Sequence, residues 1–160
     1  MYYINYFFVF SILGHLLEII LYNKSGILFG WWTPIYGIGS VIILLINYLL
    51  IEKLKLKRAI KVIVLFLACA IILSTIEFIG GNLIEYFFHT SFWDYTKYKY
   101  NFGKYAALEM SLIWGLSSIL LIYFLKPLMD KIIGKIPKYL TYLLIILFII
   151  DLVITIFIKH

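Results

Sequence analysis

The chain has 160 residues, of which 64% are hydrophobic and only 14% are charged. Soluble domains carry about a quarter charged residues, so this composition excludes an ordinary soluble domain and favours lipid as the main solvent. The net charge of +6 lies in short segments between apolar runs, which is typical of membrane flanks and excludes a nucleic-acid-binding surface.

Five apolar segments are long enough to cross a bilayer, at about 1–22, 34–51, 59–88, 105–125 and 139–158. Each must be helical, because an open strand would leave backbone groups unpaired in lipid. The third is longer than a straight crossing needs, so we expect it to tilt or to break at Gly80 and Gly81. We expect the fourth to stop at Lys126 and Pro127. The sequence predicts an all-α polytopic helix bundle that forms one integral membrane domain, 1–160.

Basic residues are most frequent in segments 52–58 and 126–138, which five crossings place on the same side. Cytoplasmic loops carry the excess of lysine and arginine in membrane proteins. We therefore expect a multi-pass protein of the cell membrane with a cytoplasmic N-terminus and an external C-terminus. The N-terminal segment lacks the basic start and the cleavage site of a signal peptide, so we interpret it as a retained span.

A weak internal repeat links the first and third segments. Gly14 to Glu18 and Gly81 to Glu85 both read glycine, polar residue, two aliphatic residues, glutamate. Each motif precedes an aromatic-rich outer loop and a returning helix. Chance similarity between apolar sequences is the alternative. A true repeat predicts two parallel helical hairpins, a construction used by transporters, with the fifth helix as an addition.

Five carboxylates fall within the spans or at their ends, and the expected orientation places all of them in the outer half or near the midplane. An ionised group at the bilayer centre costs about 2.5–3.5 kcal/mol, so we expect them to face the bundle, a cavity or each other. Three residues of the third segment, at i, i+4 and i+8, form one stripe. The five acids are Glu18, Glu77, Glu85, Glu109 and Asp151.

Clustered carboxylates in a low dielectric repel one another, so some must be protonated or paired with a cation. This predicts a site for a proton, a cation or a cationic substrate. His15 lies three residues before Glu18 and could share a proton with it, although packing is the commoner role for such a histidine. In the alternative interpretation the acids form hydrogen bonds within the bundle and only stabilise it.

Two aromatic motifs in the outer loops add further candidates. An interfacial aromatic belt explains the presence of these rings, but not their clustering with glycine, proline and aspartate. Asp94 either caps a turn, which is its commoner role, or contributes to an acidic mouth. The residues that the motifs add to the candidate site are Trp31, Tyr36, Trp93, Asp94, Tyr95 and Asn101.

Sequence signatures of catalysis are missing. The chain has no phosphate-binding Gly-x-x-x-x-Gly-Lys loop, no His-Glu-x-x-His zinc motif and no Gly-x-Ser-x-Gly elbow. Its single cysteine, Cys69, offers neither an internal disulfide nor metal-ligand spacing. We therefore expect no metal and no cofactor, and we favour a protein that is not an enzyme.

The motifs resemble, in order and spacing, those of the bacterial family described as putative ABC-transporter type IV. The resemblance covers 10–127, and it implies a membrane protein of transporter type. Trp31, Phe92 and Lys104 stand where the family pattern has proline, tryptophan and arginine. The residues that carry the resemblance are Gly14, Glu18, 30–39, Glu77, Gly81, Glu85, 92–96, 101–104, Trp114 and Gly115.

Three functions remain open at this stage. The first is a permease-like transporter subunit whose acidic cluster binds a cation, a proton or a cationic substrate. Five spans are few for a pathway, so it would need a homo-oligomer or other membrane subunits, and an ABC-type mechanism would need a separate ATPase at the basic cytoplasmic loops. The second is an outer-leaflet lipid-binding protein or membrane enzyme that uses the same carboxylates. The third is a non-catalytic scaffold subunit.

Overall fold

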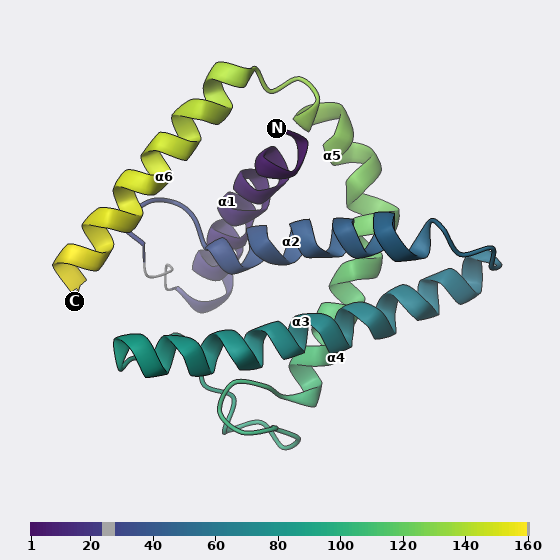
Figure 1. Ribbon diagram of the computed structural model, residues 1–160, viewed down its shortest axis with the longest axis horizontal. Coiled ribbons are helices and arrows are strands. Elements are labelled where there is room, and N and C mark those ends of the chain that lie inside the picture. The colour runs from purple at the N-terminus through teal and green to yellow at the C-terminus, as the bar shows by residue number, and fades with distance from the viewer. Residues whose placement is uncertain (24–27, 160) are drawn as a thin grey trace. The chain divides into compact units, whose positions relative to one another are not determined.

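The computed structural model describes residues 1–23 and 28–159, and this part of the chain is helical apart from loops and one isolated bridge between Asn101 and Ala107. Figure 1 shows the helices, and π-helical turns extend two of them. The elements are α1 (Tyr2–Tyr22), α2 (Pro34–Ile46) with a π-helical turn (Asn47–Ile51), α3 (Arg58–Phe88), α4 (Leu108–Leu120) with a π-helical turn (Leu121–Leu125), α5 (Lys126–Ile133) and α6 (Lys138–Lys159).

Five helical stretches in the described part are long and apolar enough to cross a membrane. Large apolar side chains cover their outer surfaces; Phe157, for example, is 82% exposed. Such surfaces are stable in lipid and costly in water. The predictions of an all-α fold, five spans and a multi-pass membrane protein are confirmed. The spans are Tyr2–Leu21, Pro34–Ile51, Arg58–Phe87, Leu108–Ile133 and Lys138–Ile158.

The third span has no break, so that its tilt stays a prediction, and the end expected for the fourth span is wrong. Helix α3 continues through Gly80 and Gly81 without a break, and its 31 residues measure about 46 Å, more than a straight crossing requires. The fourth span does not stop at Lys126 and Pro127, because α5 follows the π-helical turn directly. Proline lacks the backbone N–H of a normal helical hydrogen bond. The π-helical turn just before it shifts the local hydrogen bonds to i−5 and accommodates the missing donor.

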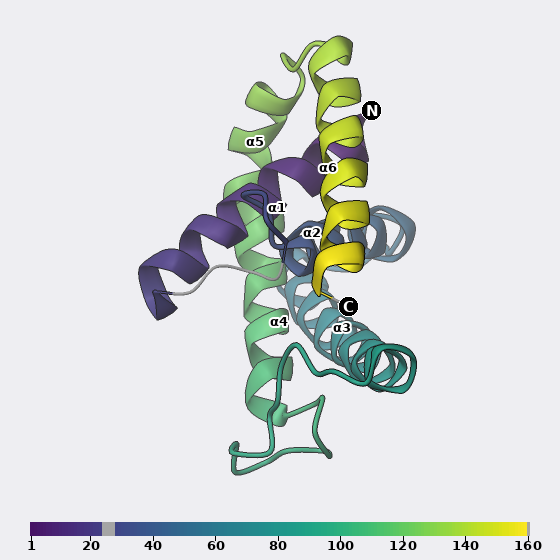
Figure 2. The same cartoon turned by 90° about the vertical axis from the view of Figure 1, so that its left-hand side faces the viewer.

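The chain forms two compact units, each described here by itself. Unit 1 comprises Met1–Val41 and Pro127–His160, and unit 2 comprises Ile42–Lys126. Unit 1 contains α1, α6, the first half of α2 and nearly all of α5. Unit 2 contains α3, α4 and both π-helical turns. In unit 2 the irregular segment 89–107 leads from the end of α3 into α4 (Figure 2).

Polar contacts join the N-terminal end of α1 to α5 and α6 in unit 1. The hydroxyls of Tyr2 and Tyr6 each donate to Asp130 Oδ1 at 2.7 Å. The buried Thr141 hydroxyl donates to Asn5 Oδ1 at 2.7 Å. These contacts place the N-terminal end of α1 beside the connection between α5 and α6. Which side of the membrane this end faces stays a prediction.

In unit 2, α3 and α4 pack as an antiparallel pair. Phe66 covers Gly115, the Ser74 hydroxyl donates to Ser111 Oγ at 2.6 Å, and Gly81 lies under Tyr105. Successive contact positions along α3 therefore meet successively earlier residues of α4 and of the segment before it. Glycine at the contact points allows the two backbones to approach closely.

The two glycines of the sequence repeat make the same kind of contact. A Cβ atom at Gly14 would lie 2.3 Å from the Tyr36 ring, and one at Gly81 would lie 2.3 Å from the Tyr105 ring. Each glycine thus contacts the tyrosine that follows the loop after its own helix. This is the arrangement that the repeat hypothesis expects, and the repeat itself stays a hypothesis.

A methyl group at Gly81 should destabilise the protein, because Tyr105 is only 1% exposed and has no room to move. We expect Gly81→Ala to lower the free energy of unfolding by about 1–3 kcal/mol, as overpacking does. Gly80 is the matched control, since nothing lies within 4 Å of a Cβ there. Gly80→Ala should be neutral or stabilising. Thermal unfolding in detergent measures both, and equal effects would contradict the close contact.

Candidate functional site

Glu77 on α3 is the most deeply buried of the predicted acids in unit 2, with 5% of its surface exposed. Its Oε1 accepts a hydrogen bond from the Tyr95 hydroxyl at 3.1 Å. The Trp114 indole lies next to the same carboxyl group, but its N–H and Glu77 Oε2 make no hydrogen bond of standard geometry. A carboxylate can accept about four hydrogen bonds, so most of the acceptor capacity of Glu77 is unused.

The α3–α4 pair and the segment between them position this carboxyl group. Trp114 comes from α4, one turn beyond Ser111, whose hydroxyl contacts Ser74. Tyr95 comes from the intervening segment, and its backbone N–H donates to the Lys104 carbonyl at 2.7 Å. The Trp93 ring meets the Tyr105 ring edge to face at 5.8 Å. Two parts of the sequence, α4 and the segment before it, therefore pack around this part of α3.

Glu109 stands in the first turn of α4 and is a second incompletely satisfied carboxylate of unit 2. Its Oε1 accepts from the Tyr100 backbone N–H at 3.2 Å, whereas its Oε2 is buried without a partner. Glu77 lies three residues after Ser74, and Glu109 lies two residues before Ser111. The two acids therefore lie at a similar height along the α3–α4 pair, but Glu109, two residues from Ser111, is on the other side of α4 from the serine contact.

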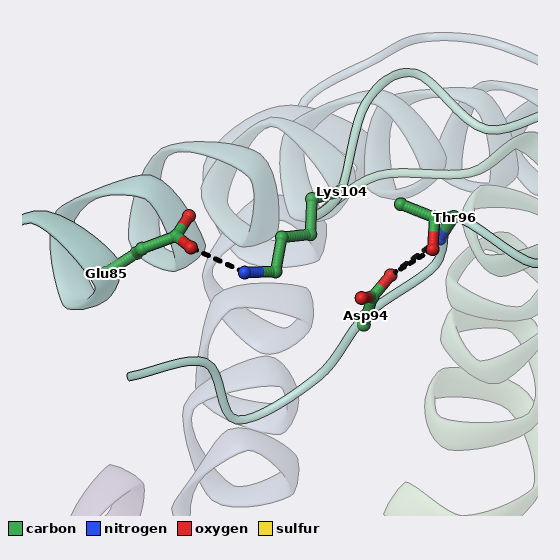
Figure 3. Close-up of polar contacts among 4 residues, drawn as sticks. All are labelled: Glu85, Asp94, Thr96 and Lys104. Atoms are coloured by element: carbon green, nitrogen blue, oxygen red, sulfur yellow. Dashed lines mark hydrogen bonds and ion pairs between the residues drawn. The ribbon is translucent and has the colours of Figure 1, made fainter. Parts of the chain in front are cut away.

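Glu85 has a different role from Glu77, although both lie on one stripe of α3. It is exposed and forms an ion pair with Lys104 at 2.5 Å, as Figure 3 shows. The Lys104 ammonium also lies 5.2 Å from the centre of the Tyr105 ring. The hydrogen bond to Glu85 raises the pKa of Lys104 above its ordinary value. Glu85 therefore fixes the end of the loop to α3.

Asp94 shapes the loop as a turn cap. Its Oδ1 accepts from the Thr96 hydroxyl at 2.6 Å and from the Thr96 backbone N–H at 2.8 Å (Figure 3). These bonds hold the pKa of Asp94 below its usual range, the side-chain bond more strongly than the backbone bond. Asn101 also acts on the loop, because its Nδ2 donates to the carbonyls of Thr96 and Tyr98.

Asp151 on α6 accepts four hydrogen bonds in unit 1. The donors are the Phe29 N–H at 3.0 Å, the Gly30 N–H at 2.8 Å, Trp32 Nε1 at 2.5 Å and the Thr155 hydroxyl at 3.2 Å. Four donors use the whole acceptor capacity of a carboxylate. The Trp32 ring also packs edge to face on Phe148 of α6 at 5.8 Å. Asp151 thus attaches the segment after α1 to α6.

The remaining candidates in unit 1 lie around the α1–α2 contact. Half-buried Glu18 accepts from the Thr33 hydroxyl at 3.1 Å. His15 is buried, and its Nδ1 has no hydrogen-bond partner among the described residues. Tyr36 covers Gly14, whereas Trp31 is 69% exposed. Glu18 and His15 therefore keep some unused hydrogen-bonding capacity, and Trp31 contributes to the surface.

Several contact residues were absent from the sequence-based site, namely Trp32, Thr33, Tyr105 and Trp114. Trp32, Thr33 and Trp114 appeared only within family motifs. A useful signal was available, since a buried indole N–H needs an acceptor and the spans offer few acceptors besides their acids. Across residues 1–23 and 28–159, no group of three or more His, Cys, Asp or Glu residues is placed to hold a metal ion. The Glu77 and Glu109 oxygens can instead take protons or a cation that itself donates hydrogen bonds.

Replacement of Asp151 should destabilise the protein strongly. Asp151→Asn turns an amide NH₂ toward the donors that now face a carboxylate oxygen, and we expect a loss of about 2–4 kcal/mol in unfolding free energy. Thr155→Val removes one bond and keeps the shape, so it should cost about 1 kcal/mol. Denaturation in detergent compares the two. A neutral Asp151→Asn would contradict the structural role of Asp151.

The Asp94 cap should make stability depend on pH in a defined direction. A folded-state pKa below the ordinary aspartate value means that ionised Asp94 stabilises the fold above that value, and that this contribution is lost as the pH falls through the folded pKa. Asp94→Asn should therefore unfold at a lower temperature than wild type at neutral pH, and the difference should vanish in acid. Thr96→Val should reduce the effect. A difference that is independent of pH would exclude this cause.

Comparison with known proteins gives one match. Residues 5–156 match the family model described as putative ABC-transporter type IV. The match is longer than the resemblance at 10–127 and reaches Asp151 on α6. No curated protein and no solved structure gives a significant match.

Proposed function

The chain belongs to the putative ABC-transporter type IV family, and from this premise we propose that it is a permease-like subunit that binds a proton or a cation at Glu77 and Glu109. The burial of Glu77 carries the proposal. This carboxyl group is 5% exposed, has one hydroxyl donor, and forms no ion pair within the described residues. Lipid offers no compensation for a charge there.

A bound proton or cation would neutralise the charge of the buried carboxylate. An uncompensated oxygen in the interior costs about 1–3 kcal/mol, and more when it is charged. Two such oxygens occur in unit 2, one on Glu77 and one on Glu109. Protonation of each acid, or a cation bound at each, would neutralise its charge and satisfy its unpartnered oxygen. A buried carboxyl group whose net charge changes when a proton or a cation binds is suited to coupling ion binding to transport.

The proposal narrows the site to part of the predicted cluster. Glu85 and Asp151 have their charges satisfied by Lys104 and by four donors. Glu18 and His15 stay secondary candidates, because their contacts leave hydrogen-bonding capacity unused. Trp93 and Tyr95 would line the site as aromatic walls.

We also propose partners for this subunit. Five spans enclose a pathway poorly, so a second copy or other membrane subunits would complete it. A separate ATPase would dock on the cytoplasmic side, at the basic segment 52–58 and at the lysines around the connection between α5 and α6. This assignment keeps the N-terminus in the cytoplasm and the C-terminus outside.

Charge-neutral variants test the site. In reconstituted vesicles, Glu77→Gln should reduce proton or monovalent cation flux at least tenfold, which corresponds to about 1.4 kcal/mol. Infrared spectroscopy should show the C=O stretch of a protonated carboxyl group in wild type at neutral pH, and this band should vanish in Glu77→Gln. Glu85→Gln is the matched control, since it lies two turns away on the same helix and is exposed.

The outcomes separate the candidate functions. Unchanged flux and an unchanged infrared band in Glu77→Gln would exclude the site. Lipid turnover by wild type that disappears in Glu77→Gln would favour the membrane enzyme. Repeated purification without an ATPase would count against the ABC-type partner, but not against the proton site.

A further inference from the structure

The segment 94–104 between α3 and α4 has a fixed backbone although it contains no helix. Asp94 closes a turn onto Thr96, and Asn101 Nδ2 donates to two carbonyls of the same segment at 2.8 and 3.2 Å. The Tyr95 N–H donates to the Lys104 carbonyl at 2.7 Å, which joins its two ends. We name segment 94–104 the external loop.

Two contacts fix the external loop to the ends of the spanning helices. Lys104 forms the ion pair with Glu85 of α3 (Figure 3). The Leu108 N–H at the start of α4 donates to the Tyr100 carbonyl at 2.9 Å. Because both neighbouring helices cross the bilayer, the loop must lie at the level of the lipid headgroups.

The surface of the external loop is aromatic and basic. Tyr98, Tyr100 and Phe102 are 40%, 53% and 61% exposed, and Lys97 and Lys99 are exposed as well. Neither of these lysines forms an ion pair in the described part of the chain. Glu85 is paired with Lys104, and Asp94 accepts from Thr96 and interacts with Lys97 electrostatically. Lys97 and Lys99 together outweigh the single charge of Asp94, so the loop surface keeps a net positive charge beside three exposed rings.

This surface matches the chemistry of one ligand class. We propose that the external loop binds the phosphate groups of anionic phospholipids through Lys97 and Lys99, while Tyr98, Tyr100 and Phe102 enter the interface between headgroups and acyl chains. Tyrosine suits that depth because its ring is apolar and its hydroxyl is polar. Lys99 Nζ lies 5.2 Å from the Tyr100 ring centre, which keeps charge and ring together. The lipid contacts use other side chains than the carboxyl groups of Glu77 and Glu109, although the same segment also donates to both acids through Tyr95 and Tyr100.

Lipid titration of the full chain tests this site. Protein in dodecyl maltoside is titrated with phosphatidylglycerol, and the unfolding temperature is measured at each mole fraction. Wild type should be stabilised by phosphatidylglycerol and much less by phosphatidylcholine. Lys97→Gln with Lys99→Gln should raise the mole fraction for half of the effect roughly ten- to thirtyfold at low salt. High salt should remove most of the difference.

A matched pair of lysines controls for net charge. Lys135→Gln with Lys138→Gln makes the same charge change at exposed positions outside the external loop and should leave the titration unchanged. Equal weakening in both double variants, or none in the loop variant, would overturn the proposal. Stabilisation by inorganic phosphate alone would assign the site to free phosphate instead of lipid. Phe102→Ser should weaken phosphatidylglycerol binding without altering its salt dependence. An unchanged affinity would contradict a contribution of the aromatic rings to lipid binding.

Discussion

A carboxylate inside a bilayer must obtain its hydrogen-bond donors from the protein, because lipid supplies none. The acids of this chain meet that constraint in different ways. Asp151 accepts hydrogen bonds from four donors, and Glu85, near the end of α3, forms an ion pair with Lys104. Glu77 has a single hydroxyl donor and keeps one oxygen unpartnered. Asp151 and Glu85 therefore have structural roles, whereas Glu77 is a candidate binding residue.

Small residues make these arrangements compatible with close packing. Gly14 and Gly81 each accept a tyrosine ring, and Gly115 accepts Phe66. In each unit the glutamate one turn after the glycine contacts the residue or loop that delivers the tyrosine. The ring and the polar contact together fix the path of the segment that follows each of these helices. In unit 2 this segment also carries Tyr95 to Glu77 and exposes the aromatic surface of segment 94–104.

The sequence was sufficient to predict the class and the number of spans, because a long apolar run in lipid has no alternative to a helix. It failed at Pro127, where a local π-helical turn accommodates the missing N–H and no residue pattern announces that turn. The acids were correctly placed in the spans, but their roles were not separable. Asp151 finds backbone N–H groups more than 100 residues away, and such contacts leave no trace in spacing or composition.

The hydrogen bonds accepted by Asp151 also constrain the order in which the protein folds. Gly30 and its acceptor are 121 residues apart, and ribosomes add about 5–20 residues per second. The turn after α1 therefore waits roughly 6–24 s for its carboxylate while the next spans are already inserted. During that interval the backbone N–H groups of this turn and the Trp32 indole N–H must donate hydrogen bonds to water or to lipid headgroups. The hydrogen bonds that attach Gly30 and Trp32 to Asp151 consequently form only after α6 has been synthesised.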